Sequence, residues 1–345
     1  MSSDGAILVI GPSWVGDMVM AQALFMTLKS RQPERPIDLV APAWALPLAA
    51  RMPEIRHAIP MPAGHGELAL ASRYHLGLSL RGRHAQAILL PNSFKSALLP
   101  WFAKIPRRTG FLGEWRFGLL NDIRHLDKSA LPRTVQRFVA LGLSAQETLP
   151  EVLPLPHLLA SAADGESILA EHGLGGSDAL LVFCPGAEYG LAKRWPVHHF
   201  AALAADRIAS GWRVAVLGSA RERPLGESIV SGFGNQAVNL AGRIDLVAAV
   251  DVLARADAVV TNDSGLMHVA AALNRPGVAI FGSSDPKHTP PLGESIRVIS
   301  LGLACAPCFK RTCPEGVARC LEEITPERVL AGLMRRDGEV AGQQN

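Results

Sequence analysis

A carboxylate stands at the start of a helix in the segment 11–17 (GPSWVGD), which follows the first apolar run of the chain. The run, residues 6–10, is typical of a buried strand, and the periodic residues after the loop predict a helix over 18–28. An ionised Asp17 there is favoured by the helix dipole and can cap free N–H groups. The same carboxylate, facing a binding cleft, can act as a general base. The sequence leaves both roles open.

Two adjacent cations, Lys193 and Arg194, lie in a second loop, residues 184–196 (CPGAEYGLAKRWP), after an apolar run of the second half. Backbone N–H groups of a glycine-containing loop and of the next helix start can surround phosphate oxygens. Lysine adds a point charge and arginine a two-pronged contact. We interpret this segment as a phosphate-binding loop, against the alternative that the pair is ordinary surface charge.

Small polar residues form a third loop, residues 261–268 (TNDSGLMH), before a helix predicted over 269–273. Its free amides suit a diphosphate or a sugar. Asp263 can accept hydrogen bonds from sugar hydroxyls, or it can cap the helix. His268 can be a core histidine. A fourth loop, residues 282–291 (GSSDPKHTPP), is long and polar enough to line a cleft.

Three nucleotide-binding signatures are missing from the chain. The first loop is not G-x-G-x-x-G, and neither a G-x-x-x-x-G-K-[ST] loop nor an Asp-x-Asp pair occurs. The first absence argues against a dehydrogenase. Without an acidic metal clamp, we expect no metal in the reaction, and the charge of a bound diphosphate must be neutralised by Lys193, Arg194 and helix starts.

The elements that must position these loops alternate between short apolar runs and periodic stretches. This pattern predicts an α/β protein with parallel sheets covered by helices on both faces. The expected strands are 6–10, 37–41, 87–90, 179–183, 213–217, 258–261 and 278–281, and the clearest further helices are 199–208 and 246–254. We expect two Rossmann-like domains, 1–155 and 176–325, a linker over 156–175, and a C-terminal helix and tail over 326–345. Ligands of such sheets bind at the carboxyl ends of the strands, so the cleft between the domains is the expected site.

Composition excludes several classes of protein. The 345 residues are 48% hydrophobic and 19% charged, which rules out wholesale disorder. No run of 18 apolar residues predicts a membrane-spanning helix, and the N-terminal apolar run is too short for an export signal, so a cytoplasmic protein is expected. Residues 73–137 hold 12 basic and 3 acidic side chains, a surplus that attracts anions or forms a solvated face. The low aromatic content and the lack of a DNA- or RNA-recognition motif argue against nucleic-acid binding.

Four of the five cysteines gather in the pattern Cys305-x2-Cys308-x4-Cys313-x6-Cys320. Four thiols at such spacing can hold a structural zinc ion, although the pattern is not that of a standard finger. They can equally remain reduced structural thiols, because a reducing cytoplasm disfavours disulfides. Redox chemistry is a third interpretation. The sequence leaves all three open.

Four segments together resemble one enzyme family. They are residues 13–18 (SWVGDM), 90–96 (LPNSFKS), 184–196 and 261–276 (TNDSGLMHVAAALNRP). In this combination and order the chain is similar, over nearly its whole length, to the lipopolysaccharide heptosyltransferases of glycosyltransferase family 9. The resemblance implies GT-B architecture, two facing Rossmann-like domains, and an inverting, metal-independent transfer from ADP-heptose with no cofactor.

The resemblance also assigns roles by position. Asp17 matches the catalytic base, Lys193 the lysine that binds the diphosphate, and Asp263 the aspartate that holds the heptose. The other donor positions implied are Arg194 beside Lys193, Glu222 at the ribose, Ile244 near the adenine, the backbone of Ser264, Gly265 and Leu266 at the diphosphate, and His268 without an assigned role.

The implied acceptor is a phosphorylated heptosyl-Kdo-lipid A at the cytoplasmic face of the inner membrane, which the enzyme would contact peripherally. Lys95, Arg107 and Arg108 of the basic segment are the expected phosphate ligands. Domain closure would bring Asp17 to the donor sugar and exclude water. The alternatives are a family member with another core acceptor, a nucleotide-sugar epimerase that needs no acceptor, and a two-lobed solute-binding protein.

Overall fold

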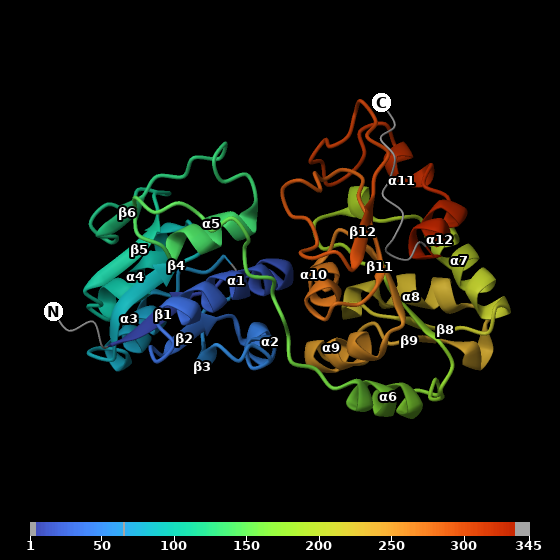
Figure 1. Cartoon of the computed structure of the whole chain (residues 1–345), viewed down its shortest axis with the longest axis horizontal. Coiled ribbons are helices and arrows are strands. Elements are labelled where there is room, and N and C mark those ends of the chain that lie inside the picture. The colour runs from blue at the N-terminus through green and yellow to red at the C-terminus, as the bar shows by residue number, and fades with distance from the viewer. Residues whose placement is uncertain (1–4, 65, 335–345) are drawn as a thin grey trace. The chain divides into compact units, whose positions relative to one another are not determined.

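The computed structural model describes residues 5–64 and 66–334, which divide into two compact units. Unit 1 runs to Leu159 and includes the later segment Lys287–Thr289, and unit 2 holds Ala160–Pro286 and the chain from Pro290 onward. The division falls inside the segment that we expected to be a linker. Each unit has its own parallel sheet with helices on both faces (Figure 1), which confirms the predicted α/β class.

The sheet of unit 1 has six parallel strands in the order β3-β2-β1-β4-β5-β6. The strands are β1 (Ala6–Ile10), β2 (Ile37–Ala41), β3 (Ile55–Pro60), β4 (His84–Leu89), β5 (Arg107–Phe111) and β6 (Asp122–Arg124). The sequence predicted β1, β2 and the end of β4, whose residues are mostly buried apolar side chains. It missed β3, β5 and β6, which lie toward the edges and carry polar, partly exposed residues.

Helices of unit 1 pack in two pairs, α1 against α5 and α3 against α4 (Figure 1). They are α1 (Val15–Arg31), α2 (Leu46–Ala49), α3 (Leu70–Ser79), α4 (Phe94–Phe102) and α5 (Thr134–Leu141). Close packing of the first pair depends on Gly142, where an added Cβ would lie 2.5 Å from Leu24 Cδ1. The face under α4 is a core of aliphatic side chains from β1, β4 and α4.

Unit 2 repeats this topology, with the strand order β12-β11-β10-β7-β8-β9. The strands are β7 (Leu180–Cys184), β8 (Arg213–Val216), β9 (Ala237–Asn239), β10 (Ala258–Asn262), β11 (Gly277–Ile280) and β12 (Ile296–Ile299). In both units the strand that comes first in the sequence pairs with the fourth. This is the doubly wound order, in which the chain reverses its winding between those two strands.

Helices of unit 2 cover both faces of its sheet (Figure 1). They are α6 (Ala162–Glu171), α7 (Val197–Ala209), α8 (Arg223–Val230), α9 (Leu246–Arg255), α10 (Gly265–Ala272), α11 (Arg319–Glu322) and α12 (Pro326–Met334). Helix α6 fell within the expected linker, yet it packs on α9 so closely that a Cβ on Gly165 would lie 2.2 Å from the Asp251 carbonyl oxygen. Helix α12 packs on β11 and β12, and the expected tail 335–345 lies outside the described residues.

Candidate active site

The point where the winding reverses in unit 2 lies between β7 and β10, and the loops that follow these strands carry Lys193 and Asp263. Lys193 ends a 3-10 turn, Leu191–Lys193, and its Nζ lies 2.5 Å from Oδ2 of Asp263. The hydroxyl of Ser284, after β11, donates to the same carboxylate oxygen at 2.5 Å. Since the N-cap of α10 is Ser264, the alternative role of Asp263 as a helix cap is wrong.

A buried amide joins the two loops. Asn262, the last residue of β10, donates from Nδ2 to the Pro185 carbonyl oxygen at 2.6 Å and accepts from the Trp195 N–H at 3.0 Å. It therefore holds both ends of the segment that contains Lys193. The buried indole of Trp195 donates in turn to the Ile324 carbonyl oxygen at 2.8 Å. Sequence analysis did not single out Asn262, although a polar residue at the end of a buried strand was the available signal.

Glu222 lies against the same segment from the end of β8. Its carboxylate accepts from the Ser219 N–H at 2.7 Å in a capping box. A Cβ on Gly186 would lie only 1.8 Å from Glu222 Oε1, so this carboxylate touches bare backbone. Ile244, half-buried, immediately precedes the N-cap of α9. Both residues follow the carboxyl ends of strands, as do Lys193 and Asp263.

His268 lies on α10, where it is buried. Burial lowers the pKa of its imidazole to about 4, while the charge of Asp263 raises the pKa and that of Lys193 lowers it. The ring is therefore neutral near pH 7 and lies beside the ion pair. The other predicted positions are half-buried at the loop and the start of α10: Arg194, Ser264, Gly265 and Leu266. Within the described chain the buried Arg194 Nε has no hydrogen-bond partner.

Asp17 occupies the corresponding loop of unit 1, after β1 and in the first turn of α1. The N-cap is Trp14, and no hydrogen bond to the Asp17 carboxylate occurs among the described residues, so the capping role is not realised. Burial raises the pKa of the Asp17 carboxyl to about 6, and the nearby charge of His288 partly offsets the rise. Near pH 7 the group is a carboxylate with more than ordinary affinity for a proton.

His288, whose charge acts on Asp17, comes from an unexpected part of the chain. It belongs to Lys287–Thr289, which the chain contributes to unit 1 after completing β11 of unit 2. Its Nδ1 lies 2.8 Å from the Pro132 carbonyl oxygen, and its own carbonyl accepts from the Thr134 N–H at 3.3 Å. The expected fourth loop is therefore divided, with Ser284 at Asp263 and His288 in unit 1.

The loop after β4 stands next to the Asp17 loop, because β1 and β4 are neighbours in the sheet. A fully buried arginine, Arg116, organises it: Nη1 donates to the Pro91 carbonyl oxygen at 2.8 Å and Nη2 to Asn92 Oδ1 at 3.4 Å. Burial lowers the pKa of Arg116 to about 10. Lys95, half-buried at the start of α4, is thereby held at the same edge of the sheet as Asp17.

Arg107 and Arg108 lie elsewhere. They begin β5, at the opposite edge of a parallel sheet from the loops that follow β1 and β4. Arg107 Nε pairs with Asp122 Oδ2 at 2.9 Å, and Arg108 donates to the carbonyl oxygens of Leu119 and Ile105 at 2.5 and 2.6 Å. The structure therefore does not bring these arginines to Asp17. Arg107, Arg108 and the buried Arg116 of the basic segment are thus engaged by groups of the protein itself.

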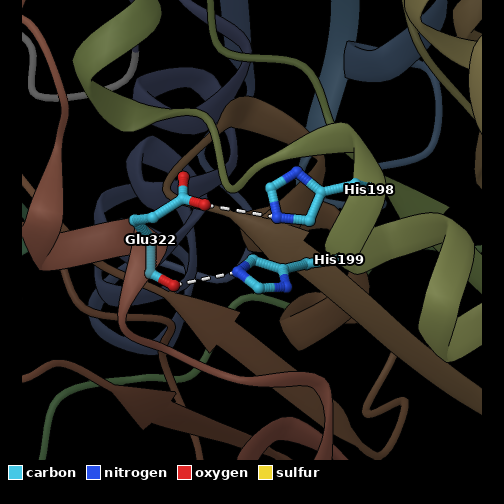
Figure 2. A group of neighbouring side chains, drawn as sticks. All are labelled: His198, His199 and Glu322. Atoms are coloured by element: carbon cyan, nitrogen blue, oxygen red, sulfur yellow. Dashed lines mark hydrogen bonds and ion pairs between the residues drawn. The ribbon is translucent and has the colours of Figure 1, made fainter.

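A group of metal-ligand types lies outside these loops. The Glu322 carboxylate lies 3.2 Å from His198 Nε2, and the Glu322 backbone oxygen lies 2.9 Å from His199 Nε2 (Figure 2). The latter contact uses the His199 Nε2 as a donor to a carbonyl, so this nitrogen is not available to a metal ion. The exposed His198 and Glu322 form an ordinary surface ion pair, and the group serves to attach α11 to α7.

A cavity of about 980 Å³ lies at the other end of the unit 2 sheet, lined among others by Asp257, Pro276 and Ser295. These residues directly precede β10, β11 and β12, so the cavity faces the amino ends of the strands. Open α/β sheets bind their ligands at the carboxyl ends. The cavity is therefore distinct from the loops that carry Lys193 and Asp263.

Two doubly wound units, with Lys193 and Asp263 at the winding reversal of one and Asp17 at that of the other, form the GT-B architecture found among glycosyltransferases. A family model for glycosyltransferase family 9 (heptosyltransferase) matches residues 73–318. The chain belongs to this family and is an enzyme of the heptosyltransferase type. Among the described residues, none of the helices combines the length and the apolar composition of a membrane span.

Similar proteins cover nearly the whole chain. Lipopolysaccharide heptosyltransferase 2 of Salmonella typhimurium is 49% identical over 95% of this chain and 97% of its own length. The structure of E. coli ADP-heptose lipopolysaccharide heptosyltransferase II is 47% identical, with a TM-score of 0.86 over 95% of this chain and 97% of that chain. The E. coli heptosyltransferase WaaC with ADP, 20% identical, shares the fold with a TM-score of 0.69, over 94% of this chain and 98% of its own.

Proposed function

We propose that this enzyme transfers the heptose of ADP-L-glycero-D-manno-heptose to the first heptose of the lipopolysaccharide inner core. Support comes from the 49% identity to a lipopolysaccharide heptosyltransferase 2 over nearly both whole chains. The observation that carries the proposal within this molecule is the contact between Lys193 and Asp263, at the winding reversal of unit 2. It provides one cation for a diphosphate and one carboxylate for a sugar.

Donor binding by unit 2 follows from the charges of this pair. An incoming diphosphate competes with Asp263 for the Lys193 ammonium, and the released carboxylate can then accept hydrogen bonds from heptose hydroxyls. Arg194 and the amides at the start of α10 complete the diphosphate contacts. Glu222 would receive the ribose hydroxyls, and Ile244 would provide an apolar surface for the adenine.

Transfer itself needs a base. Asp17 takes the proton of an acceptor hydroxyl as its oxygen bonds to the anomeric carbon of the donor. The bond from that carbon to the diphosphate breaks on the opposite side, which inverts the configuration and releases ADP. General-base help of this kind contributes a factor of roughly 10²–10⁴, and the raised pKa of Asp17 suits a base that works near neutral pH.

Negative charge grows on ADP as it leaves. Lys193, Arg194 and the loop amides would stabilise it, an electrostatic contribution that is usually the largest in such reactions. The missing Asp-x-Asp pair supports a reaction that needs no divalent metal. Activity that is unchanged by EDTA is therefore expected.

The acceptor is a heptosyl-Kdo-lipid A that carries phosphates, reached by peripheral contact at the cytoplasmic face of the inner membrane. Lys95 is the candidate phosphate ligand, because its loop lies beside the Asp17 loop. Arg107 and Arg108 are left out of this proposal, since they are engaged at the other edge of the sheet.

The decisive experiment mixes purified enzyme and ADP-heptose with truncated core acceptors, following ADP release and product mass. The proposal requires ADP release that depends on acceptor, and a product heavier by one heptose. A different core acceptor as the only one used would favour another member of the family. Conversion of the nucleotide-sugar without any acceptor would favour an epimerase.

A further inference from the structure

Three large aromatic side chains are exposed around one loop of unit 1, and the proposed transfer reaction uses none of them. Trp115 is 86% exposed and Phe117 is 60% exposed, and both lie in residues 112–121, the loop that joins β5 to β6. Phe94, at the start of α4, is 43% exposed. We call these three residues the aromatic patch. Single exposed apolar residues are ordinary, but a group of large ones marks a surface that binds a partner.

The aromatic patch is held together by contacts within the loop and with α4. The rings of Trp115 and Phe117 have their centres 6.4 Å apart. Glu114, which precedes Trp115, accepts a hydrogen bond from the Phe94 N–H at 2.7 Å through its carboxylate. The loop thereby satisfies a free N–H at the start of α4. This contact brings Phe94 to the same part of the surface as the other two aromatic residues.

Arg116, between the two exposed aromatic residues of the loop, is fully buried. Its Nη1 donates to the Pro91 carbonyl oxygen at 2.8 Å, and its Nη2 donates to the Phe111 carbonyl oxygen. These hydrogen bonds fix the middle of the loop to the ends of β4 and β5. Because the arginine points inward, Trp115 and Phe117 on either side of it are presented to solvent.

The backbone at the tip of the loop is strained. Glu114 and Trp115 have φ angles of +43° and +54°, in the left-handed region that residues with a side chain seldom adopt. Such strain persists only where surrounding contacts enforce it, and it gathers at functional sites. Since the Trp115 side chain is almost fully exposed, the strained turn does not serve to fill the core of unit 1.

The aromatic patch lies where the carboxyl ends of the strands of unit 1 meet. Phe94 follows β4, and the Leu112 N–H donates to the carbonyl oxygen of Arg124, the last residue of β6, at 2.8 Å. Two exposed basic residues, Lys128 and Arg133, lie in the segment that follows β6 at this edge. Within the part of the chain that the structure describes, neither forms an ion pair. Their charges are therefore available to an anionic partner.

We propose that the aromatic patch inserts into the headgroup region of an anionic phospholipid bilayer, with Lys128 and Arg133 against the lipid phosphates. Tryptophan is enriched at the boundary between headgroups and acyl chains, because its ring is apolar and its N–H can keep a polar partner. Basic side chains beside such rings add attraction to anionic lipids. The patch therefore has both the apolar and the charged part of a membrane-binding surface.

This inference rests on the proposed function where it concerns the acceptor, which is itself a lipid. Lys95, the candidate ligand of the acceptor phosphates, directly follows Phe94. The loops that carry Asp17 and Lys95 follow neighbouring strands, so they lie at the same edge of the sheet as the aromatic patch. An inserted patch would direct this edge toward the sugars at the bilayer surface. The acceptor could then reach the base without leaving the bilayer.

The first measurement is cosedimentation of the substrate-free enzyme with vesicles of phosphatidylethanolamine and phosphatidylglycerol. The double variant Trp115→Ala/Phe117→Ala should bind them at least about tenfold more weakly than the wild type, because two rings no longer leave water. Lys128→Ala should bind about fivefold more weakly, and added salt should weaken binding of the wild type. Absence of wild-type binding, or equal binding by the double variant, would overturn the proposal.

Trp101→Ala is the matched control. This tryptophan is 46% exposed near the end of α4. Because β4 and β5 are parallel, the helix between them returns to the opposite edge of the sheet. Trp101→Ala should therefore bind vesicles as the wild type does. A loss as large as that of the double variant would show that the bilayer contact is not specific to the aromatic patch, and would overturn the proposal.

A fluorescence measurement guards against variants that fail to fold. Brominated phosphatidylcholine in the same vesicles should quench the tryptophan emission of the wild type more than that of Trp115→Phe, which keeps an aromatic ring and should retain most of the binding. Equal quenching in the two proteins would overturn the proposal. These readouts need no substrate, so a wild type that binds vesicles but transfers no heptose would contradict the proposed function alone.

Two other occupants of the aromatic patch predict different results. If its rings stacked on acceptor sugars, Trp115→Ala/Phe117→Ala would raise the KM for a deacylated, water-soluble acceptor. The bilayer proposal requires that KM to stay unchanged, with activity lost only toward the acceptor in vesicles. If the patch joined two copies of this chain, light scattering would show a dimer that the double variant dissociates. Either a raised KM or such a dimer would overturn the proposal.

Discussion

Lys193 Nζ lies 2.5 Å from Oδ2 of Asp263, although 70 residues separate the two in the sequence. The pair joins the loops on either side of the winding reversal in unit 2. Each partner is therefore neutralised before any ligand arrives, which reduces the cost of keeping a buried carboxylate ionised. In the proposed mechanism a diphosphate would compete with Asp263 for the Lys193 ammonium, which would link binding of the diphosphate to the availability of Asp263 for the sugar.

Lys193→Ala should weaken donor binding and turnover together. The variant removes a charge-assisted contact to the diphosphate and leaves the Asp263 carboxylate with one donor fewer, for a loss of about 10- to 100-fold in ADP affinity. Calorimetry with ADP and steady-state kinetics with ADP-heptose measure it. Lys29→Ala, at the end of α1 in unit 1, is the control that should behave as wild type. An unaltered donor affinity and rate in Lys193→Ala would remove this residue from the site.

Asp17→Asn should slow the transfer reaction without weakening donor binding. The amide cannot accept the proton of the acceptor hydroxyl, so turnover should fall by roughly 10²–10⁴. ADP affinity should stay within about twofold, because the donor contacts are assigned to unit 2. Full turnover in the variant would refute the assignment of the base.

The pH profile should report the same carboxyl group. With a pKa of about 6 for Asp17, kcat/KM should be level above pH 7 and fall tenfold per pH unit well below pH 6, as the base becomes protonated. Since the charge of His288 lowers this pKa, His288→Ala should move the inflection to higher pH. A profile that stays level down to pH 5 would contradict the role of Asp17.

The raised pKa of Asp17 should also lower the stability of the folded protein at neutral pH. The carboxyl pKa is about 6 in the folded chain against an ordinary value of 3.8, so the wild type loses stability as pH rises from 4 to 6. Asp17→Asn does not titrate and should be more stable at pH 7.5, by no more than about 3 kcal/mol. Urea denaturation of both proteins at pH 4 and pH 7.5 measures it. The difference between them should nearly vanish at pH 4.

Gly186→Ala should displace the Glu222 side chain without removing its charge. The added Cβ would lie 1.8 Å from Glu222 Oε1, so the carboxylate must move. If this carboxylate holds the ribose, the variant should raise the KM for ADP-heptose, and Glu222→Ala should do the same. Because the two changes act through one contact, the double variant should be no worse than Glu222→Ala. Independent, multiplying effects would show that Gly186 matters for another reason.

Buried strands were the part of the fold that could be predicted from the sequence. Strands β1 and β2 consist of residues that are buried along their whole length, and their predicted bounds are confirmed. Strand β3, with Arg56 and His57 exposed toward one edge, carries no such pattern. Its pairing with β2 comes from tertiary context that a local pattern does not contain.

Residues of the candidate site that depend on tertiary contacts were likewise hard to predict from the sequence. Asp17, Lys193 and Asp263 could be found because each follows an apolar run, where parallel sheets place their ligands. Ser284 and Arg116 could not, because each acts through partners distant in the sequence, such as Asp263 for Ser284. Asn262 was missed although its place at the end of a buried strand offered a signal. The count of basic residues suggested Arg107 and Arg108 as phosphate ligands. This was misleading, because a count does not tell which end of a strand a residue occupies.

The return of residues 287–289 to unit 1 means that this enzyme cannot be divided by one cut. A fragment ending at Leu159 would have the six strands of unit 1 but not His288, and the Pro132 carbonyl and Thr134 N–H would lose their partner. Its Asp17 would also lack the imidazole that moderates its proton affinity. The unit that holds Asp17 therefore includes three residues that are synthesised only after β11 of unit 2, so a fragment with all the residues of unit 1 must contain two separate stretches of the chain.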